Sequence, residues 1–364
     1  MITLRIAVLP GDGVGPEVMV EAQKTLDALA AKKGFRVEYR TGLVGAASLD
    51  KTGEPVTQDT LDMCRECDAI LFGAIGDPRW DNAPAHQRPE RGLLRIRKEF
   101  GCFANLRPIK VYPALKSMSV LRPEILEKGV DILMFRELTG GVYYREPKGR
   151  TTVDGQPAAV DTMLYTEEEI VRIARVAFTA AQQRRKKVTS VDKANVLASS
   201  QLWREVVTKV SADFPDVTLE HQLVDSMAMK LITSPSHYDV VLTENMFGDI
   251  LSDEGGVLTG SLGMLPSGTI SLAPPSFFEP VHGSAPDIAG QGKANPLGMI
   301  LSMSMMLRYA FNMESEAQEV ETAVERVLNN GYRTPDIVHA RAEGVEVQLV
   351  STQQMGDLVV AELG

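Results

Sequence analysis

The chain has 364 residues, of which 44% are hydrophobic and 24% are charged, so it is long enough for two packed domains of about 150 to 200 residues each. A formal net charge of −10 and a pI near 5.2 argue against sequence-independent binding of nucleic acid, which needs a basic surface. An anionic substrate would therefore need a local cluster of basic residues.

Strands and helices alternate from the N-terminus. Strands are predicted at IAVL, near 35–41 and at 69–72, with helices at 16–30 and 58–67 between them. This alternation predicts an α/β fold with parallel strands and helices on both faces of the sheet. Residues 1–5 lead into the first strand without a signal-peptide core, and no run reaches the roughly 18 apolar residues of a membrane helix. We expect a cytoplasmic protein that makes no membrane contact.

A glycine-rich turn, LPGDGVGPE, follows the first strand, where a Rossmann fingerprint would lie. Its glycines are followed by Pro16 and lack the third small residue that lets helix and strand pack closely at a pyrophosphate. Pro16 is instead typical of the first turn of a helix. The nucleotide is therefore sought elsewhere in the chain.

Three cysteines, Cys64, Cys67 and Cys102, make an odd number that fits reduced thiols. Cys64 and Cys67 form a CxxC pair, but no second pair or nearby histidine completes a zinc site. With Leu61 they fall at helical spacing before a strand, which favours packing in the core.

The middle of the chain is also predicted to be α/β. Helical patterns at 166–185 and 197–214 lead into the strands VTSVDKAN and VTLEHQLV. Between 143 and 163, β-prone residues flank Asp154 and Gly155, which predicts a hairpin arm. Further helices are expected at 299–307, a methionine-rich core segment, and at 316–329.

Basic residues occur where strands or turns end. Arg97, Arg107 and Arg136 lie in separate segments and could clamp carboxylates bidentately, although for each arginine taken singly a surface ion pair is the commoner case. Lys193 follows an apolar strand that opens into a helix, a usual place for site residues. It could act as a base or form a salt bridge at the strand end.

The segment NMFGDILSDE reads as a helix that carries Asp249 and Asp253 one turn apart. Its neighbouring arc is predicted to be buried and consists of Met246, Phe247, Ile250, Leu251 and Val257. Two acids beside a buried side suit a metal ion, and a solvated acidic face is the alternative.

The long loop EPVHGSAPDIAGQGKANP, residues 279–296, is the candidate nucleotide site. Asp287 could accept hydrogen bonds from ribose hydroxyls and would repel a 2′-phosphate, which favours NAD over NADP. The alternative is a surface loop with a helix start at Pro286 and Asp287.

Six motifs, GDGVGPE, NLRP, RELTGGVYY, SVDKANVL, NMFGDILSDE and EPVHGSAPDIAG, resemble in this order the β-decarboxylating dehydrogenases, and most of all those that oxidise isopropylmalate. The resemblance covers essentially the whole chain. It implies the isopropylmalate/isocitrate dehydrogenase fold, a non-Rossmann pair of α/β domains around a cleft. One domain would comprise 1–102 and 261–364, and the other 103–260 with an arm at about 142–163.

The same resemblance implies NAD-dependent oxidative decarboxylation of 3-isopropylmalate to 4-methyl-2-oxopentanoate in leucine biosynthesis, by a homodimer with shared active sites. Lys193 and Tyr143 would be catalytic, and Asp225, Asp249 and Asp253 would hold Mg²⁺ or Mn²⁺. The substrate would contact Arg97, Arg107, Arg136, Asp225, Leu93 and Leu94. The NAD site would include segment 76–89 and Val14, Glu90, Glu279, His282, Gly283, Ser284, Ala285, Asp287, Ile288 and Asn295.

Some positions depart from the family pattern, namely Tyr144, Arg145, Ser226, Gly255 and Gly256. None removes an implied ligand. The alternatives are a sister dehydrogenase acting on D-malate, tartrate or homoisocitrate and, more remotely, an inactive NAD-binding homologue. The presence of Lys193, Tyr143 and the three aspartates argues against the inactive homologue.

Overall fold

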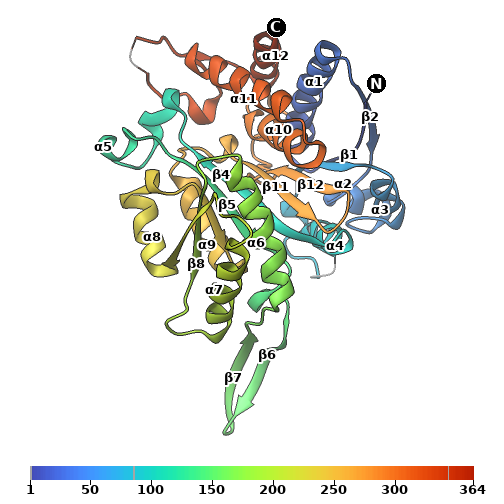
Figure 1. The fold of residues 1–364 in the computed structure, drawn as a ribbon. Helices are drawn as coiled ribbons and strands as arrows, with labels where there is room; N and C mark the ends of the chain where they lie inside the picture. Colours follow the sequence, from blue (N-terminus) through green and yellow to red (C-terminus); the bar gives the residue numbers. More distant parts are fainter. Residues whose placement is uncertain (1, 85–86, 343) are drawn as a thin grey trace. The chain divides into compact units, whose positions relative to one another are not determined.

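The computed structural model describes residues 2–84, 87–342 and 344–364 (Figure 1). Contacts divide the chain into two compact units. Unit 1 comprises Met1–Cys102, Val111–Val120 and Thr259–Gly364, and unit 2 comprises Phe103–Lys110 and Leu121–Leu258. Both units combine strands and helices, which confirms the predicted α/β class. Within the described ranges, each helix is too short or too polar to cross a bilayer.

The strands of unit 1 follow the order β2-β1-β3-β12-β11. Strand β1 is parallel to β2 and β3, and β12 is parallel to β3, whereas β11 runs antiparallel to β12. The carboxyl ends of β1, β3 and β12 therefore lie at one edge, where open α/β sheets bind ligands. The strands are β1 Thr3–Gly11, β2 Arg36–Thr41, β3 Ala69–Ala74, β11 Pro266–Ser271 and β12 Ser276–Pro280, with a small pair β13 Tyr332–Arg333 and β14 Gln348–Leu349.

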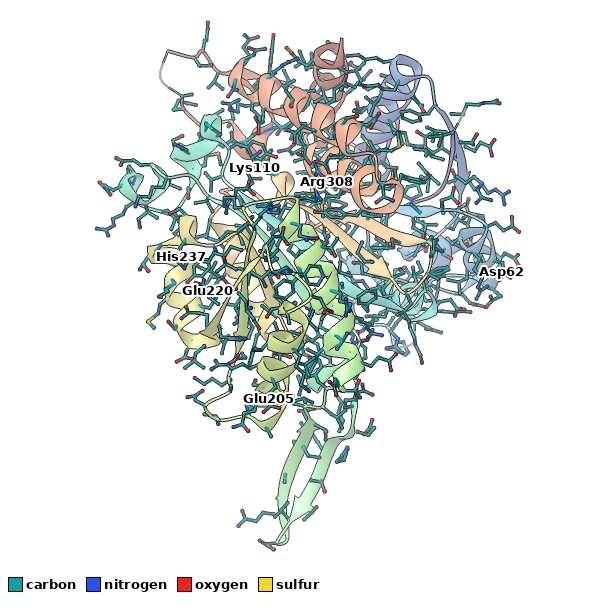
Figure 2. The ribbon with its side chains drawn as sticks, viewed as in Figure 1. Asp62, Lys110, Glu205, Glu220, His237 and Arg308 are labelled. Carbon is teal, nitrogen blue, oxygen red and sulfur yellow. The ribbon has the colours of Figure 1, made fainter. Side chains whose placement is uncertain are left out.

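The predicted helices of unit 1 form with small shifts at their ends. The methionine-rich segment is entirely buried in α10, as predicted. Arg308, labelled in Figure 2, lies on α10. It pairs with Glu314 and Glu321 on α11 and so joins the two helices. The helices are α1 Gly15–Lys33, α2 Ala46–Thr52, α3 Gln58–Arg65, α4 Glu90–Glu99, α10 Leu297–Phe311, α11 Glu314–Asn329 and α12 Thr352–Leu363.

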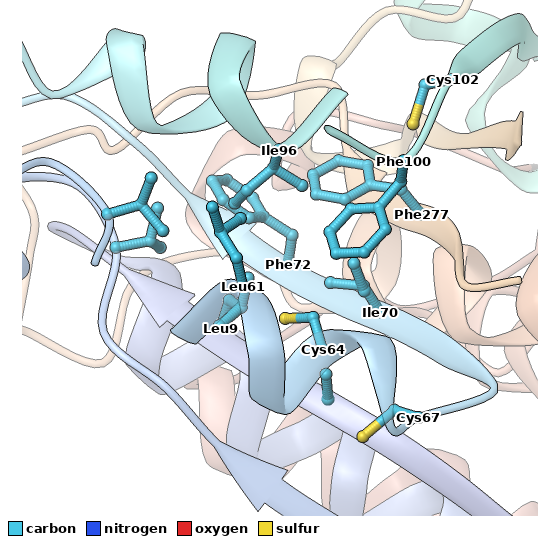
Figure 3. Close-up of a cluster of buried hydrophobic side chains, with 13 residues drawn as sticks. Leu9, Leu61, Cys64, Cys67, Ile70, Phe72, Ile96, Phe100, Cys102 and Phe277 are labelled. Carbon is cyan, nitrogen blue, oxygen red and sulfur yellow. The ribbon is translucent and has the colours of Figure 1, made fainter. Parts of the chain in front are cut away.

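The three cysteines pack in the core of unit 1, as predicted. Cys64, Cys67 and Cys102 are free thiols buried in one apolar cluster with Phe72 and Phe277 (Figure 3). Burial raises the pKa of the Cys64 thiol to about 12. Burial also raises the pKa of the Cys67 and Cys102 thiols, which favours a packing role over reactivity for all three cysteines.

The strands of unit 2 follow the order β4-β5-β10-β8-β9. Strand β4 is antiparallel to β5, and the other four are mutually parallel. The carboxyl ends of β5, β10, β8 and β9 thus share one edge. The strands are β4 Cys102–Lys110, β5 Asp131–Glu137, β8 Lys187–Asp192, β9 Thr218–Leu223 and β10 Val240–Thr243.

The hairpin arm forms as predicted from strands β6 Arg145–Val153 and β7 Gln156–Thr162, which pair antiparallel. Asp154 and Gly155 at its tip have φ values of 53° and 76°, the left-handed conformation that a two-residue hairpin turn requires. The arm projects beyond helices α6 and α7 of the same unit (Figure 1). The helices of unit 2 are α5 Pro123–Leu126, α6 Glu167–Gln182, α7 Ala198–Ser211, α8 Val224–Thr233 and α9 Asn245–Val257.

Candidate active site

Helix α9 begins directly after the carboxyl end of β10, and a buried carboxylate caps it. Glu244 accepts the backbone N–H groups of Met246 and Phe247 and a 2.7 Å hydrogen bond from the Tyr165 hydroxyl. Burial, and then the charge of nearby Glu137, raises the pKa of Glu244 despite these donors. The cap holds the first turn of α9 at the edge of the sheet.

The predicted buried arc of α9 is partly wrong. Phe247 and Leu251 are buried, but Ile250 and Val257 are 61% and 58% exposed. The buried side is centred instead on the glycines of the helix, where a Cβ at Gly255 would stand 2.2 Å from the Ile109 side chain. Without side chains, these glycines let the helix lie close to its neighbours and leave Ile250 and Val257 facing outward.

Two sequence-predicted site residues converge on Asp249. One Asp249 carboxylate oxygen accepts a hydrogen bond from Arg136, and the other accepts a 3.0 Å hydrogen bond from the Tyr143 hydroxyl. The Arg136 guanidinium also lies 6.0 Å from the centre of the Tyr143 ring. Burial, followed by the bond to Asp249, raises the pKa of Tyr143, so the phenol keeps its proton at neutral pH. Asp253, one turn further along α9, is exposed.

Lys193 follows the carboxyl end of β8 and contacts Asp225 in the first turn of α8. The Lys193 Nζ lies 2.7 Å from Asp225 Oδ1, and this hydrogen bond lowers the pKa of the Asp225 carboxyl. The preceding residue, Asp192, is buried, accepts the Ala194 N–H and is paired with Arg204. In the single chain, Lys193 thus forms the strand-end salt bridge considered above.

The three implied metal ligands do not form one group in a single chain. Over residues 2–84, 87–342 and 344–364, no set of three or more His, Cys, Asp or Glu side chains is placed to hold a metal ion. Asp249 and Asp253 share α9, whereas Asp225 lies on α8 with Lys193.

The other arginines also have acidic or amide partners. Arg107 on β4 donates to Asn105 at 2.8 Å in unit 2. Arg97 in unit 1 pairs at 2.6 Å with Glu279, at the end of β12. The two leucines that were expected to contact the substrate differ in their surroundings. Leu93 packs against the core cluster, whereas Leu94 is exposed.

The glycine-rich turn and the candidate nucleotide loop touch in unit 1. The Val14 N–H donates to the Ser284 carbonyl at 2.8 Å, and a Cβ at Gly13 would stand 1.9 Å from the same oxygen. The sequence interpretation overlooked Asp12, whose buried carboxylate accepts the N–H groups of Ala46, Ala47 and Gly76, each at 3.0 Å. The sequence did contain a signal for Asp12, since it is a carboxylate inside a glycine turn at the end of a strand.

One ring nitrogen of His282 is buried without a hydrogen-bond partner among the described residues. Its Nδ1 lies 2.9 Å from the Gly283 carbonyl, and among the described residues its buried Nε2 has no hydrogen-bond partner. Burial lowers the pKa of His282, so the ring is neutral. With Nδ1 as the donor, Nε2 is free to accept a hydrogen bond from a ligand. A Cβ at Gly283 would meet open space.

The remaining residues of the implied NAD set lie along the same loop or near it. Asp287 is exposed and Ile288 is partly buried. The helix start considered for Pro286 and Asp287 does not form, and the next helix, α10, begins at Leu297. Asn295 accepts the Leu297 N–H and donates to Asp336, so it helps to start α10. Ala285 has a positive φ of 39°, and a Cβ at Gly76 would stand 3.4 Å from Glu90 Oε1. Within segment 76–89, residues 85 and 86 lie outside the described residues.

Comparison with known proteins places this architecture in one class. The family model described as isocitrate/isopropylmalate dehydrogenase matches residues 5–359. Among solved structures, isocitrate dehydrogenase from Methylococcus capsulatus superposes with a TM-score of 0.82 at 31% identity and covers 99% of both chains. A β-decarboxylating dehydrogenase from Thermococcus kodakarensis gives a TM-score of 0.80 at 35% identity, over 99% of this chain and 96% of that one. The chain therefore belongs to the isocitrate/isopropylmalate dehydrogenase family of oxidoreductases.

More similar sequences carry a narrower name. The 3-isopropylmalate dehydrogenase of Oleidesulfovibrio alaskensis is 54% identical over 357 residues, which is 98% of both chains. That of Geobacillus kaustophilus is 54% identical over 96% of this chain and 93% of its own length.

Proposed function

We propose that the protein catalyses the NAD- and divalent-metal-dependent oxidative decarboxylation of 3-isopropylmalate to 4-methyl-2-oxopentanoate, a step of leucine biosynthesis. The observation that carries the proposal is the cluster of Arg136, Tyr143 and Asp249 at the carboxyl edge of unit 2. It combines a carboxylate clamp, a proton donor and a metal ligand. The similarity to named 3-isopropylmalate dehydrogenases supports the same substrate.

The residues of unit 1 fit a bound NAD. The buried Nε2 of His282 has no hydrogen-bond partner among the described residues and can accept a hydrogen bond from a ligand. The exposed Asp287 carboxylate suits ribose hydroxyls. When bound, NAD⁺ supplies the acceptor for the substrate hydride.

The proposed metal ligands fit Mg²⁺ or Mn²⁺, since Asp225, Asp249 and Asp253 offer only carboxylate oxygens, which hard cations prefer. When bound, such an ion polarises the substrate's hydroxyl and carbonyl oxygens and offsets negative charge. The hydrogen bonds from Arg136 and Tyr143 orient the Asp249 carboxylate that would bind it.

The remaining roles fall to side chains of this protein. Arg97, Arg107 and Arg136 bind the substrate carboxylates. Lys193 removes the proton of the substrate's C2 hydroxyl as C2 is oxidised to a ketone. The β-keto acid formed in this step then loses CO₂. Tyr143 keeps its proton at neutral pH and donates it to convert the enol into the ketone product.

We also propose a homodimer in which each active site takes Asp249 and Asp253 from one subunit and Lys193 and Asp225 from the other. An exposed apolar face supports this arrangement. On α8, Asp225 lies on the same face as Met229 and Ile232, and the three residues are exposed at helical spacing.

Helix α9, which packs against α8, has the matching pattern, because Asp253 lies between the exposed Ile250 and Val257 on one face. Burial of these two apolar faces against a second copy would bring the acidic residues beside them to the interface.

The three buried free thiols fit the reducing cytoplasm, which we propose as the location.

A substrate panel tests the proposed function. With Mg²⁺ and NAD⁺, the increase in NADH absorbance should give a kcat/KM about 50-fold higher for 3-isopropylmalate than for malate. The reason is that burial of three further carbons contributes about 2.4 kcal/mol, which is roughly 50-fold. The product should be 4-methyl-2-oxopentanoate with one CO₂ per NADH. An equal or higher kcat/KM for D-malate, tartrate or homoisocitrate would identify a sister enzyme instead.

The nucleotide preference is a separate prediction. NAD⁺ should be used at least about 100-fold better than NADP⁺, because Asp287 would lie against the 2′-phosphate, and such like-charge contacts cost several kcal/mol. Asp287→Ser should narrow the ratio of the two kcat/KM values, because it removes the repulsion of the 2′-phosphate and so raises kcat/KM for NADP⁺, while loss of the hydrogen bonds to the ribose lowers kcat/KM for NAD⁺. Lys293→Ala is the matched control and should leave the ratio unchanged, since Lys293 donates to Gln291. A wild-type ratio near one would mean that Asp287 does not face the ribose.

A further inference from the structure

Asn245, the first residue of α9, lies behind the cluster of Arg136, Tyr143 and Asp249 and is only 1% exposed. A buried primary amide needs partners for one acceptor and two donors. Its contacts therefore show which parts of unit 2 it holds together.

The side-chain oxygen of Asn245 accepts two hydrogen bonds from Arg136. Arg136 donates to Asn245 Oδ1 through Nε at 3.1 Å and through Nη2 at 3.0 Å. The remaining terminal nitrogen, Nη1, reaches Asp249. The stem of Arg136 lies against Gly248, where a Cβ would stand 2.7 Å from Arg136 Cγ. The amide and the glycine together restrict the orientation of the guanidinium plane.

The Asn245 amide nitrogen holds the turn that carries Tyr143. Nδ2 donates to the Gly140 carbonyl at 3.2 Å, directly before the 3₁₀ turn Gly141–Tyr143. The backbone of Asn245 is fixed in turn, because its N–H donates to the buried Tyr165 hydroxyl at 3.0 Å. One side chain thus joins the arginine, the tyrosine turn and the start of the metal-ligand helix.

We propose that Asn245 is a positioning residue that aligns the Arg136 guanidinium for the substrate carboxylate and sets the position of the Tyr143 turn. This inference rests on the proposed function, in which Arg136 binds 3-isopropylmalate. Asn245 itself touches neither substrate nor metal and acts through Arg136 and Gly140. Its removal should therefore weaken substrate binding and leave NAD⁺ binding in unit 1 unchanged.

The test uses Asn245→Ala and Asn245→Asp in the full-length protein with Mg²⁺. Both variants should raise the Kd and KM for 3-isopropylmalate at least about tenfold, because small misalignments of a binding group have large effects. Alanine removes both sets of contacts. Aspartate keeps the volume but cannot donate to Gly140, and its charge competes with the substrate for Arg136. The KM for NAD⁺ should stay within about twofold of wild type, as expected for sites that do not share contacts.

Ser252→Ala is the matched control. Ser252 is also buried on α9, and its hydroxyl donates to the Asp249 backbone carbonyl without touching Arg136. Its loss removes one buried hydrogen bond and should lower the midpoint of thermal unfolding by less than Asn245→Ala does, but it should leave the substrate KM unchanged.

A double-mutant cycle with Arg136→Lys separates positioning from general stability. Lysine cannot make the two contacts with Asn245 Oδ1, so adding Asn245→Ala to it should raise the substrate Kd by less than about twofold. If the two single effects multiply, or if Asn245→Ala raises both KM values alike, Asn245 is only structural and the inference is wrong. If Arg136→Lys alone leaves the substrate Kd unchanged, the proposed role of Arg136 fails, and the inference fails with it.

Discussion

Mixing inactive Lys193→Ala subunits with inactive Asp249→Asn subunits should restore about one quarter of wild-type activity. Random exchange makes about half of the dimers hybrids, and in the shared-site arrangement one of the two clefts of each hybrid carries neither substitution. The other cleft carries both. Activity is followed as NADH formation, and hybrid formation is checked by native mass spectrometry or with two affinity tags.

The matched control mixes wild-type subunits with subunits that carry both substitutions. In the shared-site arrangement each cleft of a hybrid then contains one lesion, so subunit exchange should lower activity from about half to about one quarter. Two separate sites predict the opposite pair of results, with no recovery in the first mixture and no loss in the second. That outcome, with hybrids verified, would place Lys193 and Asp249 in the cleft of one chain.

Removal of the divalent metal should abolish NADH formation, and Asp253→Asn should raise the Mg²⁺ concentration for half-maximal activity by at least about 100-fold. Residues that merely orient metal ligands already change affinity by about 10- to 100-fold, so loss of a ligand carboxylate should cost no less. Asparagine keeps the volume of the exposed Asp253, and the fold should be unaffected. Metal titrations of the chelator-treated protein measure the shift by activity and by direct binding.

Glu254→Gln is the control for this experiment, because it changes the same charge on the next residue of α9. Glu254 is partly buried, and no metal role is assigned to it. Its substitution should leave the Mg²⁺ dependence within about twofold of wild type, which is the scale for a charge that does not bind the ion directly. Equal shifts in both variants would indicate a general effect of the acidic helix and would remove Asp253 from the proposed ligands.

Local periodicity determined most of the secondary structure. The alternating strands and helices, the Asp154-Gly155 hairpin and the buried methionine helix follow from patterns within a few residues, and all three formed as predicted. The spacing of Asp249 and Asp253 on one helix is equally local. The six ordered motifs predicted the family, and the comparison with known proteins confirms it.

Only the tertiary structure decided which residues meet. Asn245 is far along the chain from Arg136 and from the turn that carries Tyr143, and it meets them because the carboxyl ends of β5 and β10 lie side by side. The buried side of α9 depends on what its glycines pack against, so periodicity alone wrongly placed Ile250 and Val257 in the core of the single chain. The physical reason is that helical and strand periods are properties of neighbouring residues, whereas strand order and side-chain pairing depend on segments that approach only in the folded chain.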